Sequence, residues 1–184
     1  MTKEVFICCA CHNSFDECEG LCYNTAMIKV ISVGKVKDKA LQTLCNEYVK
    51  RMQPYQKLDL VEVKDESIPQ NVSIKQAQQI KDKEGNAVLA KVKETDYVIL
   101  LDLHGQSCSS EEFAKKLADI QTYQSANIIF IIGGSLGVSD ALVARANYRL
   151  QLSKMTFLHQ MSKYILLEQI YRAYKIMNRE TYHK

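Results

Sequence analysis

The sequence contains no tryptophan, two prolines and seven glycines among its 184 residues. Such low glycine and proline contents exclude collagen-like and low-complexity chains, and an apolar content of 47% excludes global disorder. Apolar runs such as residues 128–132 are far shorter than the roughly 20 residues that a membrane-spanning helix needs. The sequence therefore predicts one soluble globular domain with a sizeable core and no membrane partner.

The first 26 residues differ from the rest of the chain in composition. They hold five of the seven cysteines, and four acidic side chains against one lysine. They show no sustained apolar periodicity, and their amino end is not basic as it is in a secretory signal. A strand-like pattern begins at Met27. We therefore expect residues 1–26 to be a cysteine-rich N-terminal extension outside the fold, and residues 27–184 to form the working domain.

A zinc site is the alternative interpretation of this extension. Thiolate and imidazole are zinc ligands, and the available side chains are those of Cys8, Cys11, His12, Cys18 and Cys22. Cys8 and Cys11 form one CxxC pair, but the second pair of a zinc pattern is missing, so we expect no metal. The other two cysteines, Cys45 and Cys108, lie far apart in the sequence. This usage predicts a reduced, cytoplasmic protein without a disulfide framework.

From Met27 onward, strand-like and helix-like patterns alternate. Apolar and β-branched runs predict strands at residues 28–33, 58–63, 97–103, 127–132 and 148–152. Helical spacing of apolar residues predicts helices over 38–52, from Ser73 to about residue 92, from Ser109 up to the fourth strand, over 139–146 and over 160–178. The third and fourth strands are apolar almost throughout, as central strands are. The alternation predicts a single α/β domain, a parallel sheet with helices on both faces.

Three segments are expected to meet at the carboxyl edge of this sheet, where ligands collect in open parallel sheets. They are residues 101–105, 132–137 and 152–157. The middle segment carries Gly133, Gly134 and Gly137, and glycine lets a backbone turn sharply and approach a flat base or ribose. Its spacing matches neither a Walker loop nor GxGxxG. The pattern predicts a nucleotide-like pocket, not one for NAD or ATP phosphates; a simple tight turn is the alternative.

Few isolated side chains in this sequence suggest catalysis. His104 and His159 are scattered, and we expect surface or hydrogen-bonded roles for them. Asp102 ends a buried strand and is expected to make a cap or loop hydrogen bond, while Cys108 is expected to pack in the core. The last predicted helix is apolar nearly all round, so it must be buried on more than one side. We expect a homodimer at this helix; a core helix of a monomer is the alternative.

Six motifs taken together resemble one enzyme family. They are Val33-Gly34-Lys35, the expected turn Asp82-Lys83-Glu84-Gly85, Ile131-Ile132-Gly133-Gly134, Ser153-Lys154-Met155-Thr156-Phe157-Leu158-His159-Gln160, Glu168-Gln169-Ile170-Tyr171-Arg172-Ala173 and Tyr182-His183-Lys184. Over residues 27–184 the chain resembles the bacterial 23S rRNA pseudouridine N3-methyltransferase H family, of the SPOUT class. Leu158 departs from the pattern, because close relatives often have proline there. The resemblance implies a parallel-sheet α/β fold with a C-terminal trefoil knot, a rarity among folds.

The resemblance also implies a function and a set of site residues. The implied reaction is S-adenosylmethionine-dependent methylation of N3 of a pseudouridine in a stem-loop of 23S rRNA, on assembled ribosomes. The implied donor-binding residues are Leu101, Gly133, Leu152, Ser153, Lys154, Met155, Thr156 and Phe157. Arg172, Tyr182 and His183 are candidates for contact with the target base or removal of its proton; RNA phosphate or dimer contacts are the alternatives. Arg172 and Lys175 would lie near the dimer seam.

The distribution of charge suggests where RNA would dock. Residues 145–184 hold eight basic side chains against two acidic ones, whereas residues 27–144 balance at fifteen of each. We expect RNA phosphates to contact this basic end. A non-catalytic nucleotide- or RNA-binding α/β module is the competing functional class. A flavodoxin-like redox carrier is a third, and it predicts yellow purified protein.

Removal of residues 1–26 is expected to leave methyl transfer to ribosomes unchanged, because every motif of the resemblance lies between Val33 and Lys184. The test compares the full chain with a chain that begins at Met27, using a tritiated methyl donor. A large loss of transfer in the shortened chain would show that the cysteine-rich extension takes part in the reaction.

Overall fold

The computed structural model describes residues 27–124 and 127–182. Residues 1–26 and His183 lie outside the described residues, so what is expected of them stays a prediction. Strands and helices alternate along the described chain, as predicted. In chain order they are β1 (Ile28–Val33), α1 (Lys39–Met52), β2 (Leu58–Val63), α2 (Ile74–Leu89), β3 (Tyr97–Gln106), α3 (Ser110–Gln124), β4 (Ile128–Ile132), α4 (Asp140–Arg145), β5 (Tyr148–Leu150) and α5 (His159–Met177).

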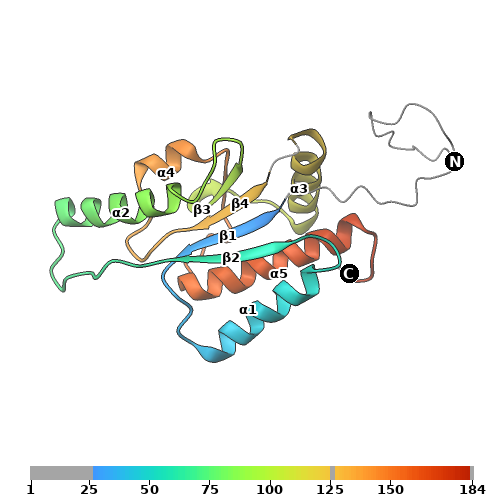
Figure 1. Ribbon diagram of the computed structural model, residues 1–184, viewed down its shortest axis with the longest axis horizontal. Coiled ribbons are helices and arrows are strands. Elements are labelled where there is room, and N and C mark those ends of the chain that lie inside the picture. Colours follow the sequence, from blue (N-terminus) through green and yellow to red (C-terminus); the bar gives the residue numbers. More distant parts are fainter. Residues whose placement is uncertain (1–26, 125–126, 183–184) are drawn as a thin grey trace, which may run out of the picture.

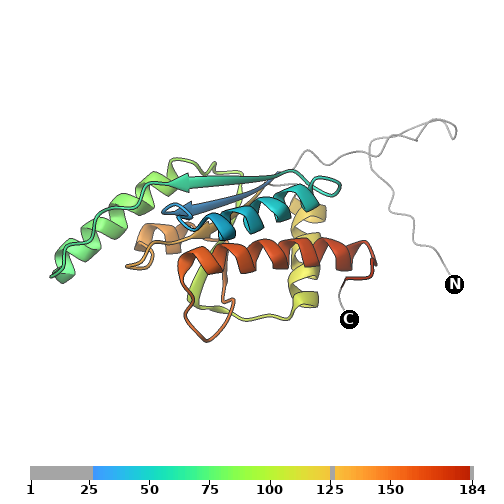
Figure 2. The same ribbon diagram turned by 90° about the horizontal axis from the view of Figure 1, so that it is seen from below.

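The strands form one sheet in the order β2-β1-β4-β3-β5, and every neighbouring pair is parallel. Figure 1 shows α2 and α4 on one side of this sheet and α1 and α5 on the other. Figure 2, turned by 90°, shows α3 beside α5, with which it packs. The predicted parallel α/β architecture with helices on both faces is therefore confirmed.

The central strand β4 separates two hydrophobic layers. All five of its residues are buried, and successive side chains point to opposite faces. Ile128, Phe130 and Ile132 join the layer formed with α1, α3 and α5, whereas Ile129 and Ile131 join the layer formed with α2 and α4. This double burial explains why the sequence shows an unbroken apolar run here, without the alternation of a strand that has one wet face.

The last helix is covered largely within its own chain. Leu166, Leu167 and Ile170 of α5 are fully buried, and α5 packs against α1, α3 and β4. Tyr48 of α1 lies edge-on to Tyr164 of α5, with ring centroids 5.6 Å apart. Contacts inside one chain thus account for most of the apolar character of α5, as in the monomer alternative. The homodimer stays a prediction.

The segment Asp82–Gly85 is helical, so the expected turn there is wrong. It lies inside α2, and Gly85 is buried against the start of α4. A Cβ built on Gly85 would overlap the hydroxyl of Ser139, the residue that caps α4 by accepting the N–H of Leu142. Glycine is required here by the close approach of two helices. The expected turn came from the resemblance, whereas the helix expected from Ser73 to about residue 92 is confirmed and ends at Leu89.

Two strand ends also differ from their predicted positions. β5 ends at Leu150, two residues early, and β3 continues to Gln106, three residues further than predicted. The register of β3 against β5 shifts between Leu101 and Gln106. A Cβ on Gly105 would lie 2.6 Å from the carbonyl oxygen of Arg149, so glycine permits this irregular pairing.

Gly85→Ala is expected to destabilise the fold by about 1–3 kcal/mol, the usual range for overpacking, because the added methyl group displaces Ser139. The gain in helix propensity, about 1 kcal/mol, opposes this cost only in part. Urea unfolding measures the free energy, with Asn86→Ala at the exposed neighbouring position as control. A Gly85→Ala protein as stable as the control would contradict the close packing of α2 on α4.

Candidate functional site

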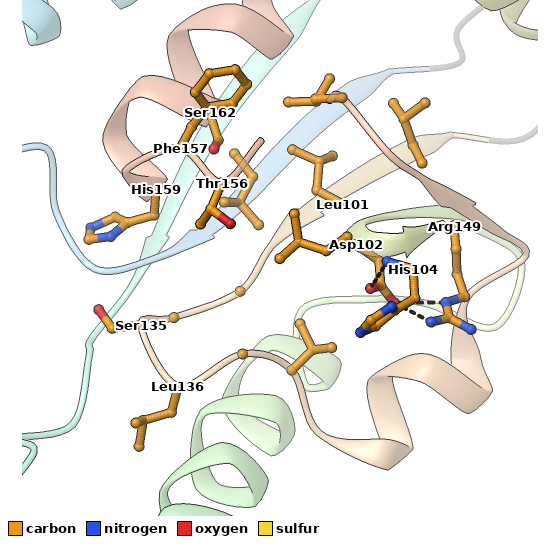
Figure 3. Close-up of a pocket in the computed structure, with 18 of the residues that line it drawn as sticks. Leu101, Asp102, His104, Ser135, Leu136, Arg149, Thr156, Phe157, His159 and Ser162 are labelled. Atoms are coloured by element: carbon orange, nitrogen blue, oxygen red, sulfur yellow. Dashed lines mark hydrogen bonds and ion pairs between the residues drawn. The ribbon is translucent and has the colours of Figure 1, made fainter. Parts of the chain in front are cut away.

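The three predicted segments line one cavity at the carboxyl edge of the sheet. Its volume is about 760 Å³, which lies within the range of small-molecule sites. The residues of these segments that line it are Leu101, Asp102, Leu103, His104, Ile132, Gly133, Gly134, Ser135, Leu136, Gly137, Leu152, Ser153, Met155, Thr156 and Phe157. Figure 3 shows Leu101 near the centre of the cavity, with Ser135 and Leu136 on one side of it and Thr156 on another.

The glycine loop after β4 forms one wall of this cavity. The N–H of Gly137 donates to the carbonyl of Gly134 at 3.1 Å, and Gly137 adopts a φ of 95°. A Cβ on Gly133 would lie 2.5 Å from Cγ1 of Val138 and 3.3 Å from the carbonyl oxygen of Gly137. The loop is therefore a tight turn, and it also lines a cavity. The glycines thus fit both the predicted pocket and the alternative of a simple tight turn. Gly133, Gly134 and Gly137 therefore line the cavity without a Cβ.

The loop between β5 and α5 forms a second wall. The N–H of Met155 donates to the hydroxyl of Ser153 at 3.0 Å, which turns the chain beside the cavity. Met155 is 72% exposed and Leu158 is 61% exposed, so large apolar side chains lie open at the rim. Leu158 occupies the N-cap of α5 without a side-chain hydrogen bond. Lys154 does not line the cavity, unlike the other donor-binding residues that the resemblance implies.

An ion pair lies at the end of the cavity next to β3 and β5. Oδ2 of Asp102 accepts from Nε of Arg149 at 2.7 Å and lies 2.6 Å from its Nη2. Oδ1 of Asp102 accepts the N–H of His104 at 2.9 Å, the loop hydrogen bond that the sequence predicted. Figure 3 shows this cluster apart from the glycine loop. Sequence analysis missed Arg149, because its partner lies 47 residues away.

Three further polar side chains were not predicted as lining residues. Lys81 reaches the cavity from α2, and His159 and Ser162 reach it from the first turn of α5. The ammonium group of Lys81 makes no hydrogen bond or ion pair with any residue of the described ranges. Because Asp102 is paired with Arg149, the cavity carries a net positive charge from Lys81. An anion or a developing negative charge is therefore favoured inside it.

The catalytic candidates that the structure describes lie elsewhere on α5 and after it. Nη2 of Arg172 lies 2.5 Å from Oε1 of Glu168, and its guanidinium lies 4.9 Å from the ring centroid of Tyr182. The hydroxyl of Tyr182 donates to the same Glu168 oxygen at 3.3 Å. Neither Arg172 nor Tyr182 lines the cavity, and Arg172 is about 20 Å along the helix from His159.

The chemistry of Arg172 limits its role. Its hydrogen bond to Glu168 raises the pKa of the guanidinium above the ordinary value, which keeps it protonated. A guanidinium has no lone pair available to accept a proton. Arg172 can therefore contact a base or a phosphate as a positive charge, but it cannot remove a proton.

Comparison with known proteins identifies the family. A family model described as "Predicted SPOUT methyltransferase" matches residues 26–183. The "Ribosomal RNA large subunit methyltransferase H" of Clostridioides difficile (strain 630) is 50% identical over 157 residues, which cover 85% of this chain and 99% of that protein. The protein of the same name from Clostridium acetobutylicum is 49% identical over the same shares. The chain belongs to the SPOUT methyltransferase family.

This membership confirms the predicted class of enzyme and fold. A solved structure, "probable rRNA-methyltransferase from Porphyromonas gingivalis", aligns with a TM-score of 0.45 at 10% identity over 83% of this chain and 70% of its own. SPOUT methyltransferases take their methyl group from S-adenosylmethionine, so the predicted methyl donor is confirmed at the level of the family. The trefoil knot and the individual donor-binding residues stay predictions.

The cavity of this SPOUT methyltransferase suits such a donor. Its volume accommodates a nucleoside with an amino-acid tail, and the glycine wall leaves main-chain groups open to a flat base. Leu101, Leu152 and Phe157 line the cavity with apolar side chains, as is usual in small-molecule sites. In the described part of the chain, no helix has the length and apolar character needed to cross a membrane.

Gly133→Val is expected to weaken donor binding about tenfold or more, or about 1.4 kcal/mol, because its side chain collides with Val138 and displaces the glycine wall. Titration calorimetry with S-adenosylmethionine measures the affinity, and thermal unfolding checks that the variant is folded. Ala144→Val, at an exposed position of α4, is the control and places the same valine side chain away from the cavity. Unchanged affinity in folded Gly133→Val would contradict the site.

Proposed function

We propose that this SPOUT methyltransferase methylates N3 of a pseudouridine in a stem-loop of 23S rRNA, in the cytoplasm and on assembled ribosomes. The observation that carries the proposal is the convergence of three segments on one cavity at the carboxyl edge of the sheet. The same segments hold the donor-binding residues implied by the sequence. Relatives at 49–50% identity, named ribosomal RNA large subunit methyltransferase H, support an rRNA substrate.

In this proposal the donor contacts Leu101, Gly133, Leu152, Ser153, Met155, Thr156 and Phe157. Lys154 belongs to the same loop, but it does not line the cavity, so only its place in the chain supports it. When bound, S-adenosylmethionine supplies an activated sulfonium methyl group. The main task of the chain is then to hold the target nitrogen in line with that group and to exclude other orientations.

Loss of the N3 proton is the second requirement of the reaction. The positive charge of Lys81 at the cavity favours the deprotonated form of the base, because it stabilises the developing negative charge. Arg149 lies at the cavity too, but Asp102 neutralises it. The target base must leave its stack to enter the cavity, as bases do for enzymes that modify them.

Arg172, Tyr182 and His183 remain our candidates for contact with the base. Because Arg172 and Tyr182 lie outside the cavity of their own chain, they could serve a site only in a second copy. The proposed homodimer, with α5 and the tail at its seam, would meet that condition. Half-buried residues such as Ile165 and Ile176 on α5 are available for such a contact.

The reaction is tested with ribosomes that lack the modification and a tritiated methyl donor. We expect label on one pseudouridine of 23S rRNA, located by digestion and mass spectrometry, and donor binding by calorimetry. Donor binding without label transfer would favour the non-catalytic module. A yellow protein with bound flavin would favour the redox carrier.

The dimer is tested by light scattering of the purified full chain. We expect the mass of two copies, because Arg172 and Tyr182 lie outside the cavity of their own chain. A monomer that transfers methyl groups at the full rate would contradict both the dimer and the assignment of Arg172 and Tyr182 to the reaction.

A further inference from the structure

The positive charge of the C-terminal part is used mostly inside the fold. Arg145 donates to the carbonyl oxygens of Lys93, Glu94 and Asp96. The other engaged cations pair with carboxylates: Arg149 with Asp102, Lys163 with Glu62, Arg172 with Glu168 and Lys175 with Glu180. Little of the basic excess that the sequence places there is therefore available to an RNA backbone.

A group of lysines without partners in the described part of the chain lies around the loops at the carboxyl edge of the sheet, next to the cavity. Six lysines there, the carboxyl-edge lysines, have no hydrogen bond or ion pair from their amino groups within the described ranges. They are Lys35, Lys37, Lys39, Lys64, Lys81 and Lys154. All are exposed except Lys81, which is partly buried in the cavity wall. Their ammonium groups are free to contact a ligand.

The fold places the first of these lysines beside the cavity. The N–H of Gly34 donates to the carbonyl of Val63 at 2.8 Å, so the segment after β1 and the segment after β2 leave the sheet side by side. A Cβ on Gly34 would lie 3.5 Å from Nε2 of His159, which lines the cavity. Figure 3 shows the chain after β1 passing next to His159.

Acidic side chains at this edge do not cancel the charge. Glu62 is paired with Lys163, and Glu66 with Lys83 at 2.8 Å. Asp38 uses its carboxylate to accept the N–H groups of Ala40 and Leu41 at the start of α1. Asp65 adjoins Gly34, and the carboxylate of Glu84 is buried under the glycine loop, where it accepts the N–H of Glu66. The six lysines therefore outnumber Asp38, Asp65 and Glu84, the carboxylates named here that have no ion pair within the described ranges.

We propose that the carboxyl-edge lysines, led by the loop Lys35–Lys39, bind the phosphate backbone of the RNA that delivers the target base. The proposal rests on the proposed function, because a base can enter the cavity only with the phosphates of its own strand on either side. Those phosphates reach the rim of the cavity, where these lysines lie. Lysine holds phosphate as a mobile point charge, which suits backbone contact without sequence readout.

The test replaces three lysines of the loop together, Lys35→Gln, Lys37→Gln and Lys39→Gln. The control replaces Lys50, Lys91 and Lys115 by glutamine, with the same change of charge at exposed positions outside the carboxyl-edge loops. Binding to a fluorescent stem-loop from 23S rRNA is measured as a function of salt. Donor affinity is measured by calorimetry, and KM and kcat are measured with ribosomes that lack the modification.

We expect the loop variant to bind RNA about tenfold or more weakly, with its salt slope reduced in magnitude by about 2–3 for three lost phosphate contacts. KM for ribosomes rises, while kcat and donor affinity stay unchanged, and the control matches the original protein. An unchanged salt slope, or an equal loss in the control, overturns the proposal. So does a defect seen on ribosomes but not on free RNA, since the partner would then be a ribosomal protein.

The same experiment separates this proposal from the proposed function. The original protein could bind the stem-loop with a steep salt slope that the loop variant lacks, yet transfer no methyl group. That result would support RNA binding by the lysines and contradict the proposed reaction. If methyl transfer occurs and the salt slopes of the two proteins agree, the reaction stands and the surface fails.

Discussion

The cavity depends on glycines at which a Cβ would collide with a neighbouring side chain or strand. At Gly133 a Cβ would meet Val138, and at Gly134 it would lie 2.5 Å from Oε2 of Glu84. At Gly105 the backbone of β5 takes the space of a side chain. Because these contacts are steric, they leave no room for even one added carbon without movement of the loops. The shape of the cavity follows from them.

Glu84 of α2 packs beneath the glycine loop that lines the cavity, and Gly85 packs against the start of α4. The carboxylate of Glu84 is buried under the glycine loop, where it accepts the N–H of Glu66 at 3.0 Å. Burial raises the pKa of this carboxyl group above its usual value, and the hydrogen bond from Glu66 opposes the rise. Gly85 allows α4 to begin directly against α2. The packing of α2 against α4 on one face of the sheet therefore holds the glycine loop in place at the carboxyl edge.

Much of this fold could be predicted from local patterns. The strands at residues 28–33 and 58–63 were predicted to the residue, because their apolar patterns end at a glycine and at polar residues. The last helix was predicted within one residue at each end. Errors occurred where a distant contact decides which residue fits or how a strand pairs: Ser139 leaves no room for a Cβ at Gly85 inside α2, and the β3–β5 pairing changes at Gly105.

The site was predictable in outline, while its charge pattern was not. Parallel strands bring their carboxyl ends together, so the three loops could be placed from the order of elements alone. The pairing of Arg149 with Asp102, and the position of Lys81 at the cavity, depend on residues far apart in the chain. Counting charges along the sequence pointed to residues 145–184, but five of the basic side chains there are engaged within the fold, while six lysines without an ion pair in the described ranges lie around the carboxyl edge.

The most direct test of the account is a crystal structure of the full chain with S-adenosylhomocysteine, the demethylated product of the donor. The account predicts its adenine and ribose in the cavity, within hydrogen-bond distance of main-chain groups at Gly133 and in the loop 152–157, against Leu101. Product bound at another place, with this cavity empty, would contradict it.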